Sequence, residues 1–285
     1  MKTSFLSIKD VFLIVAILAV PAFASARNLA TFPIGSFGGL RVFTVCYIND
    51  NQHLCSIDTG SPTAIAAVGD VFDHFPVVSK TDLKGVGTVE FACPIIQVDN
   101  FTISGQSTQQ MQLLLCSNFS LQLSPMIGMS SFDHQVFTLD FPNGMLEWSL
   151  PNDLKLYPFA RGSFGGQGLL LPVRIGGLQL TAGFDTGAPV TLVDPTVVMA
   201  HPEVFKPSSL PISDELRAAR ISVYELHSPI TVGGIDLSAG FIQVTDLSQF
   251  SDTTGHIDML IGANHLAQAR WAFDLTRNLF GVSPR

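Results

Sequence analysis

Ile57-Asp58-Thr59-Gly60-Ser61 is the stretch that decides the fold, because the same pattern returns as Phe184-Asp185-Thr186-Gly187-Ala188. A single Asp-Thr-Gly after an apolar residue is most often a structural turn. Here each copy belongs to a longer repeat. Gly35-Ser36-Phe37-Gly38-Gly39 begins 23 residues before the first aspartate, and Gly162-Ser163-Phe164-Gly165-Gly166 begins 23 residues before the second. The chain is therefore one unit written twice.

A second pair of motifs follows the first in each copy. Met126-Ile127-Gly128 stands 12 residues before Asp140, and Leu260-Ile261-Gly262 stands 12 residues before Asp274. A length of 285 residues also suits about two domains. We therefore expect a signal peptide over 1–26, an N-terminal lobe over 27–155 and a C-terminal lobe over 156–285. The polar segment 151–161 is the expected linker, and residues 169–175 and 178–185 are expected to form a hairpin turning at Gly176-Gly177.

The composition favours an all-β protein. The chain is 47% hydrophobic and only 13% charged, and its short apolar runs are broken by 24 glycines and 17 prolines. The formal net charge of −8 argues against nucleic acid or an anionic membrane as the main partner.

The N-terminus has the features of an export signal. Lys2 and Lys9 precede the apolar run from Val11 to Val20, and Ala24-Ser25-Ala26 offers small residues for cleavage. The alternative is an uncleaved membrane anchor, but the run is much shorter than the ~20 residues that span a bilayer. We expect an exported protein, periplasmic or secreted, with no stable membrane insertion once the signal is removed.

Four cysteines in an exported chain suggest disulfides. Residues 41–48 and 52–58 form the expected arms of a hairpin turning at Asn49-Asp50-Asn51, which brings Cys46 toward Cys55. Residues 89–98 and 109–116 flank the turn-rich segment 100–107, which brings Cys93 toward Cys116. The other two connectivities and four free thiols remain alternatives.

These motifs resemble those of the aspartic peptidases, both the two-lobed pepsin type and the retropepsin type. Each half is similar to a complete retropepsin-like unit, and the likeness covers nearly all of the chain after the signal. The resemblance implies an all-β, bilobal aspartic-protease fold made of two duplicated β-barrel lobes with the active site between them. It further implies that Thr59 and Thr186 hydrogen-bond to the opposite loop, and that Gly128 and Gly262 pack behind the loops.

The chemistry follows from the residues themselves. Hydrolysis of a peptide bond by water needs a base for the water and an acid for the carbonyl oxygen. Two carboxyls held together supply both, because like charges at close range cannot both ionise. Asp58 and Asp185 are thus the expected catalytic pair, and Gly60 and Gly187 let their loops approach closely because they lack Cβ.

The two loops differ at the residue after the glycine, which is Ser61 in one and Ala188 in the other. A hydroxyl donated to a carboxylate favours the charged form. This predicts that Asp58 carries the negative charge and Asp185 the proton.

Residues 83–88 are expected to form a flap tip at Gly85-Val86-Gly87. Pepsin-type flaps carry a tyrosine, and no tyrosine lies near this segment, so the pattern favours a retropepsin-like flap.

Other chemistries find little support in the sequence. No Gly-x-Ser-x-Gly or His-Glu-x-x-His motif is present, and we expect neither a metal nor a cofactor. The sequence predicts a monomeric aspartic endopeptidase acting on polypeptides. The alternative is a catalytically silent peptide-binding protein that retains the same fold.

Overall fold

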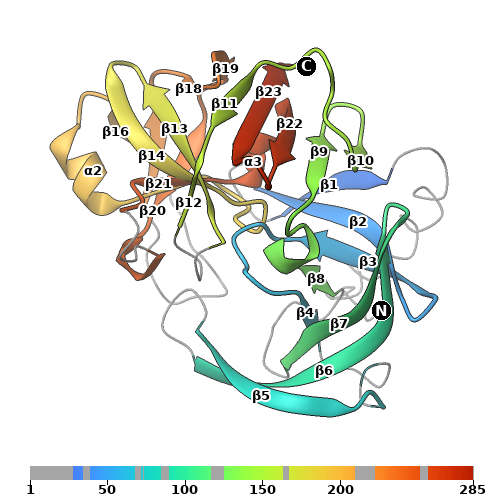
Figure 1. Cartoon of the computed structure of the whole chain (residues 1–285). Helices are drawn as coiled ribbons and strands as arrows, with labels where there is room; N and C mark the ends of the chain where they lie inside the picture. Colours follow the sequence, from blue (N-terminus) through green and yellow to red (C-terminus); the bar gives the residue numbers. More distant parts are fainter. Residues whose placement is uncertain are drawn as a thin grey trace, which may run out of the picture.

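The protein is all-β (Figure 1). The computed structural model describes residues 28–34, 39–67, 72, 74–84, 90–116, 125–162, 167–208, 222–250 and 256–284. The expected signal peptide and flap tip, with the Gly-Ser-Phe-Gly segments of the repeat, lie wholly or largely outside these residues. Among the described residues, no helix is long and apolar enough to cross a membrane.

The first half of the chain builds an eight-stranded sheet, in the order β1-β2-β3-β8-β4-β7-β6-β5. Its strands are β1 (Leu29–Pro33), β2 (Leu40–Ile48), β3 (Asn51–Ile57), β4 (Ile65–Ala67), β5 (Val77–Lys84), β6 (Glu90–Ile103), β7 (Gln106–Cys116) and β8 (Met126–Ile127).

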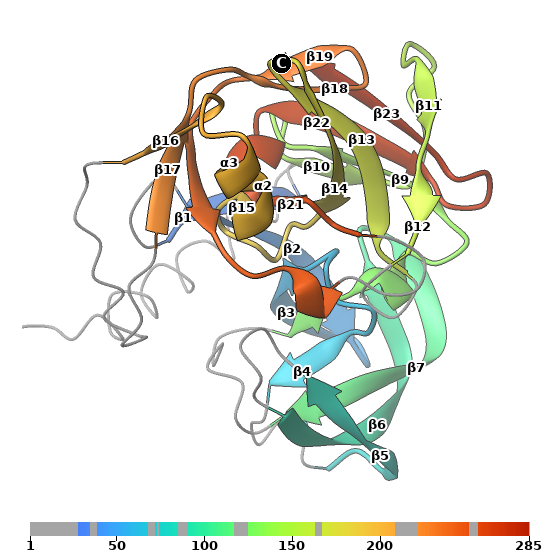
Figure 2. The same cartoon turned by 90° about the vertical axis from the view of Figure 1, so that its left-hand side faces the viewer.

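The second half builds a ten-stranded sheet, in which β16-β17-β20-β15-β21-β14-β13-β18-β19 follow one path and β12 pairs with β13. Its strands are β12 (Ala160–Arg161), β13 (Leu169–Ile175), β14 (Leu178–Phe184), β15 (Leu192–Val193), β16 (Phe205–Pro207), β17 (Ser222–Leu226), β18 (Ile230–Val232), β19 (Ile235–Leu237), β20 (Phe241–Val244) and β21 (Met259–Ile261). This sheet and the eight-stranded sheet lie on opposite sides of the molecule in both views (Figure 2).

A third sheet takes strands from both halves, in the order β10-β9-β22-β23-β11. They are β9 (Val136–Asp140), β10 (Met145–Glu147), β11 (Leu156–Pro158), β22 (Ala269–Asp274) and β23 (Leu279–Pro284). At its centre β9 and β22 run antiparallel, with Leu139 opposite Trp271, and both side chains are fully buried. The two halves therefore share hydrogen bonds and core through this sheet.

Short helices complete the described chain. They are η1 (Met129–Ser131), α2 (Pro195–Ala200), η3 (Ser248–Phe250) and α3 (Ala263–Leu266). The Asp194 side chain caps α2 by accepting a hydrogen bond from the Thr196 amide, as is typical of an N-cap.

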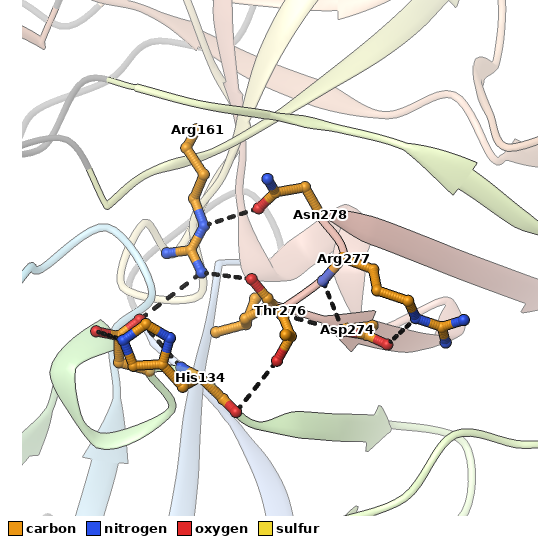
Figure 3. Close-up of polar contacts among 8 residues, drawn as sticks. His134, Arg161, Asp274, Thr276, Arg277 and Asn278 are labelled. Atoms are coloured by element: carbon orange, nitrogen blue, oxygen red, sulfur yellow. Dashed lines mark hydrogen bonds and ion pairs between the residues drawn. The ribbon is translucent and has the colours of Figure 1, made fainter.

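A polar contact extends the junction between the halves (Figure 3). The Arg161 guanidinium donates to the Asn278 Oδ1 atom at 3.4 Å and to the Leu275 carbonyl at 3.3 Å, and it lies 3.8 Å from Asp133 of the first half. Nearby, the Thr276 hydroxyl donates to the His134 carbonyl at 3.4 Å. One arginine thus bridges the β22–β23 turn and the turn before β9.

Two-residue turns set the hairpins that carry the main motifs. Asn49 and Asp50, with φ of 44° and 66°, connect β2 to β3, and left-handed residues at both positions match the twist of a tight hairpin. The Gly176-Gly177 turn joins β13 to β14. Both predicted hairpins are confirmed, but the first turn is one residue shorter than expected because Asn51 already belongs to β3.

Two local predictions are wrong. The segment 100–107 is mostly strand, because Phe101 and Ile103 are buried in the core and the turn is only Ser104-Gly105. The polar segment 151–161, expected to be a linker, contains β11 and β12, which pair with distant strands.

Both predicted disulfides are confirmed. Cys46 and Cys55 have Cα atoms 5.9 Å apart, and they lie diagonally across the hairpin, since Cys46 is opposite His53. Cys93 and Cys116 have Cα atoms 4.8 Å apart and join β6 to β7. Disulfides of this kind are typical of exported proteins.

Candidate active site

Each Asp-Thr-Gly loop is held at the end of a buried strand by a parallel neighbour. In the first half β3 pairs with β8, and the Asp58 amide donates to the Ile127 carbonyl at 2.9 Å. In the second half β14 pairs with β21, and the Asp185 amide donates to the Ile261 carbonyl at 3.1 Å. The repeated motifs of the sequence are therefore partners in space, and each Asp-Thr-Gly loop begins beside the second motif of its own half.

The two loops are tied to each other by a reciprocal exchange between Thr59 and Thr186. The Thr59 amide donates to the Thr186 Oγ1 atom at 3.1 Å, and the Thr186 amide donates to the Thr59 Oγ1 atom at 3.0 Å. Each hydroxyl then donates across the junction, Thr59 to the Phe184 carbonyl at 2.9 Å and Thr186 to the Ile57 carbonyl at 2.8 Å. Both threonines are 1% exposed, so the exchange is protected from water.

This exchange brings Asp58 and Asp185 together. A Cβ atom added to Gly187 would lie 2.2 Å from the Asp58 Cγ atom, and one added to Gly60 would lie 2.6 Å from the Asp185 Cγ atom. Each glycine of one loop therefore faces the carboxyl of the other loop at a distance that no side chain allows. Asp185 is buried and Asp58 is half-buried, so the pair still reaches solvent on the Asp58 side.

The hydrogen bonds around the two carboxyls are unequal. The Asp185 Oδ1 atom accepts from the amides of Gly187 at 2.8 Å and Ala188 at 3.2 Å. The Asp58 Oδ1 atom accepts from the Gly60 amide at 3.0 Å. The Ser61 amide, which corresponds to that of Ala188, donates instead to the Asp58 backbone carbonyl at 3.2 Å.

Burial raises the pKa of Asp58 to about 8, with the Asp185 charge acting in the same direction. Burial also raises the pKa of Asp185, but the amides of Gly187 and Ala188 and a hydrogen bond from Asp58 oppose that rise. The two carboxyls titrate as a coupled pair, and the two backbone amides on the Asp185 Oδ1 atom, against one on Asp58, favour the negative charge on Asp185.

The loop does not make the contact that the sequence-based proton placement assumes. The Ser61 hydroxyl donates to the Thr63 carbonyl at 2.8 Å and not to the Asp58 carboxylate. The asymmetry comes from the backbone amide after the glycine, which reaches the carboxylate only in the second loop.

Gly128 and Gly262 lie directly behind the two loops. A Cβ atom on Gly128 would be 2.2 Å from the Thr63 carbonyl oxygen, and one on Gly262 would be 2.4 Å from the Val190 carbonyl carbon. The residues after these glycines donate to the loops, Met129 to the Ser61 carbonyl and Ala263 to the Ala188 carbonyl, both at 2.8 Å. The two halves thus support their loops in the same way.

The second loop has an additional polar brace that the sequence reasoning missed. The Asn264 Oδ1 atom accepts from the Thr191 amide at 2.9 Å, and the Thr191 Oγ1 atom accepts from the Gly262 amide at 3.0 Å. The His265 Nδ1 atom lies 2.7 Å from the same hydroxyl. His265 is fully buried, its Nε2 atom has no partner within the described part of the chain, and burial lowers its pKa to about 4.

We also searched the described residues for metal-ligand clusters and for surface hollows. No group of three or more His, Cys, Asp or Glu residues in the described ranges could hold a metal ion. A surface hollow of about 490 Å³ lies over β13 and β14, lined by residues that include Arg174, Thr231 and Asp258, and contains neither Asp58 nor Asp185.

Comparison with known proteins does not assign this chain to a family. No protein-family model matches this chain, and no curated protein matches it. The function must therefore be argued from the geometry.

Proposed function

We propose that this protein is an exported aspartic endopeptidase with the bilobal, retropepsin-like fold, in which Asp58 and Asp185 activate one water molecule between them. The observation that carries the proposal is the reciprocal exchange between Thr59 and Thr186, which brings the two aspartates together from strands 127 residues apart in sequence. Such an exchange fixes two loops relative to each other far more tightly than a structural turn requires.

The proposed mechanism follows from the unequal carboxyls. The charged Asp185 removes a proton from the water as it attacks the peptide carbonyl carbon, and the protonated Asp58 donates its proton to the carbonyl oxygen. As the resulting tetrahedral diol collapses, Asp185 donates its proton to the leaving amine, the ionised Asp58 takes a proton from one diol hydroxyl, and the peptide bond breaks. The pair ends the cycle with one proton, as it began.

This mechanism requires one proton in the pair and so predicts the direction of the pH dependence. Because the Asp58 pKa is about 8, activity is lost as the pH rises through that value and the pair becomes fully ionised. As the pH falls, activity is lost when the pair takes up its second proton, which binds to Asp185.

The test is cleavage of an acid-denatured protein from acid to neutral pH by the wild-type chain, Asp58→Asn and Asp185→Asn. We expect either substitution to abolish cleavage while thermal unfolding shows a folded protein, and a hydroxyethylene peptide to inhibit the wild type. A wild type that binds peptides but releases no product under any condition would instead be the silent peptide-binding protein.

The remaining expectations belong to the same proposal. The active unit is complete in one chain, so it works as a monomer, and gel filtration of the active fraction tests this. Export follows from the disulfides together with the N-terminal sequence, and its direct test is N-terminal sequencing of the mature protein.

A further inference from the structure

One cation lies opposite one aspartate and has no counterpart in the other half. The pairing of β2 with β3 is continuous from Ile48 opposite Asn51 to Phe43 opposite Ser56. The pairing ends there, but continuing the same register by two residues leads from Phe43 to Arg41 and from Ser56 to Asp58, and the charges of these two side chains act on each other. Residues directly opposite each other in an antiparallel pair lie on the same face of the sheet.

The position in the second half that corresponds to Arg41 holds an uncharged residue. The repeat aligns Asp58 with Asp185, and the same offset of 127 residues aligns Arg41 with Gly168, which has no charge. A guanidinium therefore accompanies only the Asp58 side of the pair.

The start of β2 lies against the second loop, which places Arg41 near the junction of both loops. The Leu40 amide donates to the Pro189 carbonyl at 3.0 Å, and a Cβ atom on Gly39 would be 3.3 Å from the Val190 side chain. Arg41 is one residue along the same strand and is half-buried.

The Arg41 side chain is poorly compensated for its burial. It makes no hydrogen bond or ion pair with any residue in the described ranges, although its charge acts on Asp58. Loss of solvent around the guanidinium lowers its pKa, and Asp58 opposes that effect when it is ionised. A partly desolvated guanidinium with five donors and no direct acceptor is well suited to bind a carboxylate in a two-point contact.

We propose that Arg41 is a specificity-determining residue that binds the side-chain carboxylate of a Glu or Asp next to the scissile bond, so that the enzyme prefers acidic polypeptide sites. This inference rests on the proposed endopeptidase function. The protein has a net charge of −8 and as a whole repels acidic substrates, so a cation beside the scissile bond is needed to attract an acidic side chain there.

The experiment compares peptides that differ only by Glu or Gln at each of the positions flanking the cleaved bond. Wild-type kcat/KM should favour Glu over Gln by about tenfold at one position, the value of a net charge-assisted hydrogen bond. Arg41→Gln should reduce this ratio to about one, whatever its effect on the rate with the Gln peptide, and Arg41→Lys should keep part of the ratio.

Arg174→Gln is the matched control, because Arg174 is an exposed arginine on β13 and should leave the Glu preference unchanged. Thermal unfolding of each variant shows whether it is folded. A wild type without any Glu preference, or a preference that survives in Arg41→Gln, overturns the proposal.

A binding measurement separates this inference from the proposed function. Hydroxyethylene analogues of the Glu and Gln peptides cannot be hydrolysed, so their affinities for the wild-type chain report on Arg41 whether or not the protein is an enzyme. Tighter binding of the Glu analogue that disappears in Arg41→Gln supports the role of Arg41. Equal affinities overturn it, whereas absence of cleavage alone refutes only the endopeptidase.

Discussion

Gly187→Ala is the sharpest perturbation of the proposed site. Its added Cβ atom would lie 2.2 Å from the Asp58 Cγ atom and 2.2 Å from the Oδ1 atom. Non-bonded carbon atoms prefer about 3.5 Å, so the carboxyl must move by roughly 1.3 Å. A misplacement of about 1 Å costs a catalytic group about 100-fold in rate, and we expect at least that loss in kcat/KM.

The assay is single-turnover peptide cleavage, with thermal unfolding to measure the folded fraction. Gly177→Ala is the control, because a Cβ atom there meets nothing within 4 Å. Gly60→Ala is a milder companion variant, since its Cβ atom would lie 2.6 Å from the Asp185 Cγ atom. If either active-site variant is folded and cleaves at the wild-type rate, the close approach of the two loops plays no part in catalysis and the reasoning fails.

Three further predictions concern the support of the loops. Thr186→Val removes the donor to the Ile57 carbonyl and leaves buried groups unpaired, so urea unfolding should show a loss of about 2–4 kcal/mol, whereas Thr186→Ser should lose much less. Ser61→Ala should cost about 1 kcal/mol of unfolding free energy and leave the acid limb of the pH–rate profile unmoved, because the hydroxyl serves the Thr63 carbonyl; a shifted limb would contradict this. His265 is neutral when folded down to about pH 4, while the unfolded chain takes up its proton near pH 6.5, so folding stability falls as the pH falls through this window, by roughly 3 kcal/mol in full. His265→Leu should flatten that slope in urea titrations at pH 4.5 and 6.5, and an unchanged slope would rule out the histidine as its source.

The sequence predicted the all-β class and the main hairpins because their signals are local. Asn49-Asp50 and Gly176-Gly177 are two-residue turns between apolar strands, and each gives the register of its hairpin directly. The repeat likewise indicated Asp58 as the counterpart of Asp185, and the structure places the two side by side.

The details that the sequence missed depend on geometry between distant segments. β11 pairs with β23, so no local pattern around residue 156 indicates a strand. The sequence-based proton placement assumed that the Ser61 hydroxyl donates to Asp58, but the loop conformation directs that hydroxyl to the Thr63 carbonyl and the Ser61 amide to the Asp58 backbone carbonyl. Arg41 belongs to the predicted strand 41–48, but its register relative to Asp58 depends on the two-residue turn at Asn49-Asp50, where the sequence predicted a turn of three residues.

The two copies of the repeat belong to one polypeptide chain, and β9 and β22 join them in one sheet. In a symmetric pair of identical subunits, every mutation appears on both sides of the twofold axis. Here Arg41 can exist without an arginine at Gly168, and His265 without a histidine at Ser131, the position that follows the other motif glycine by the same spacing. Because both copies of the repeat lie in one chain, each copy can change at a position where the other does not, and the two sides of the proposed site can take on different roles.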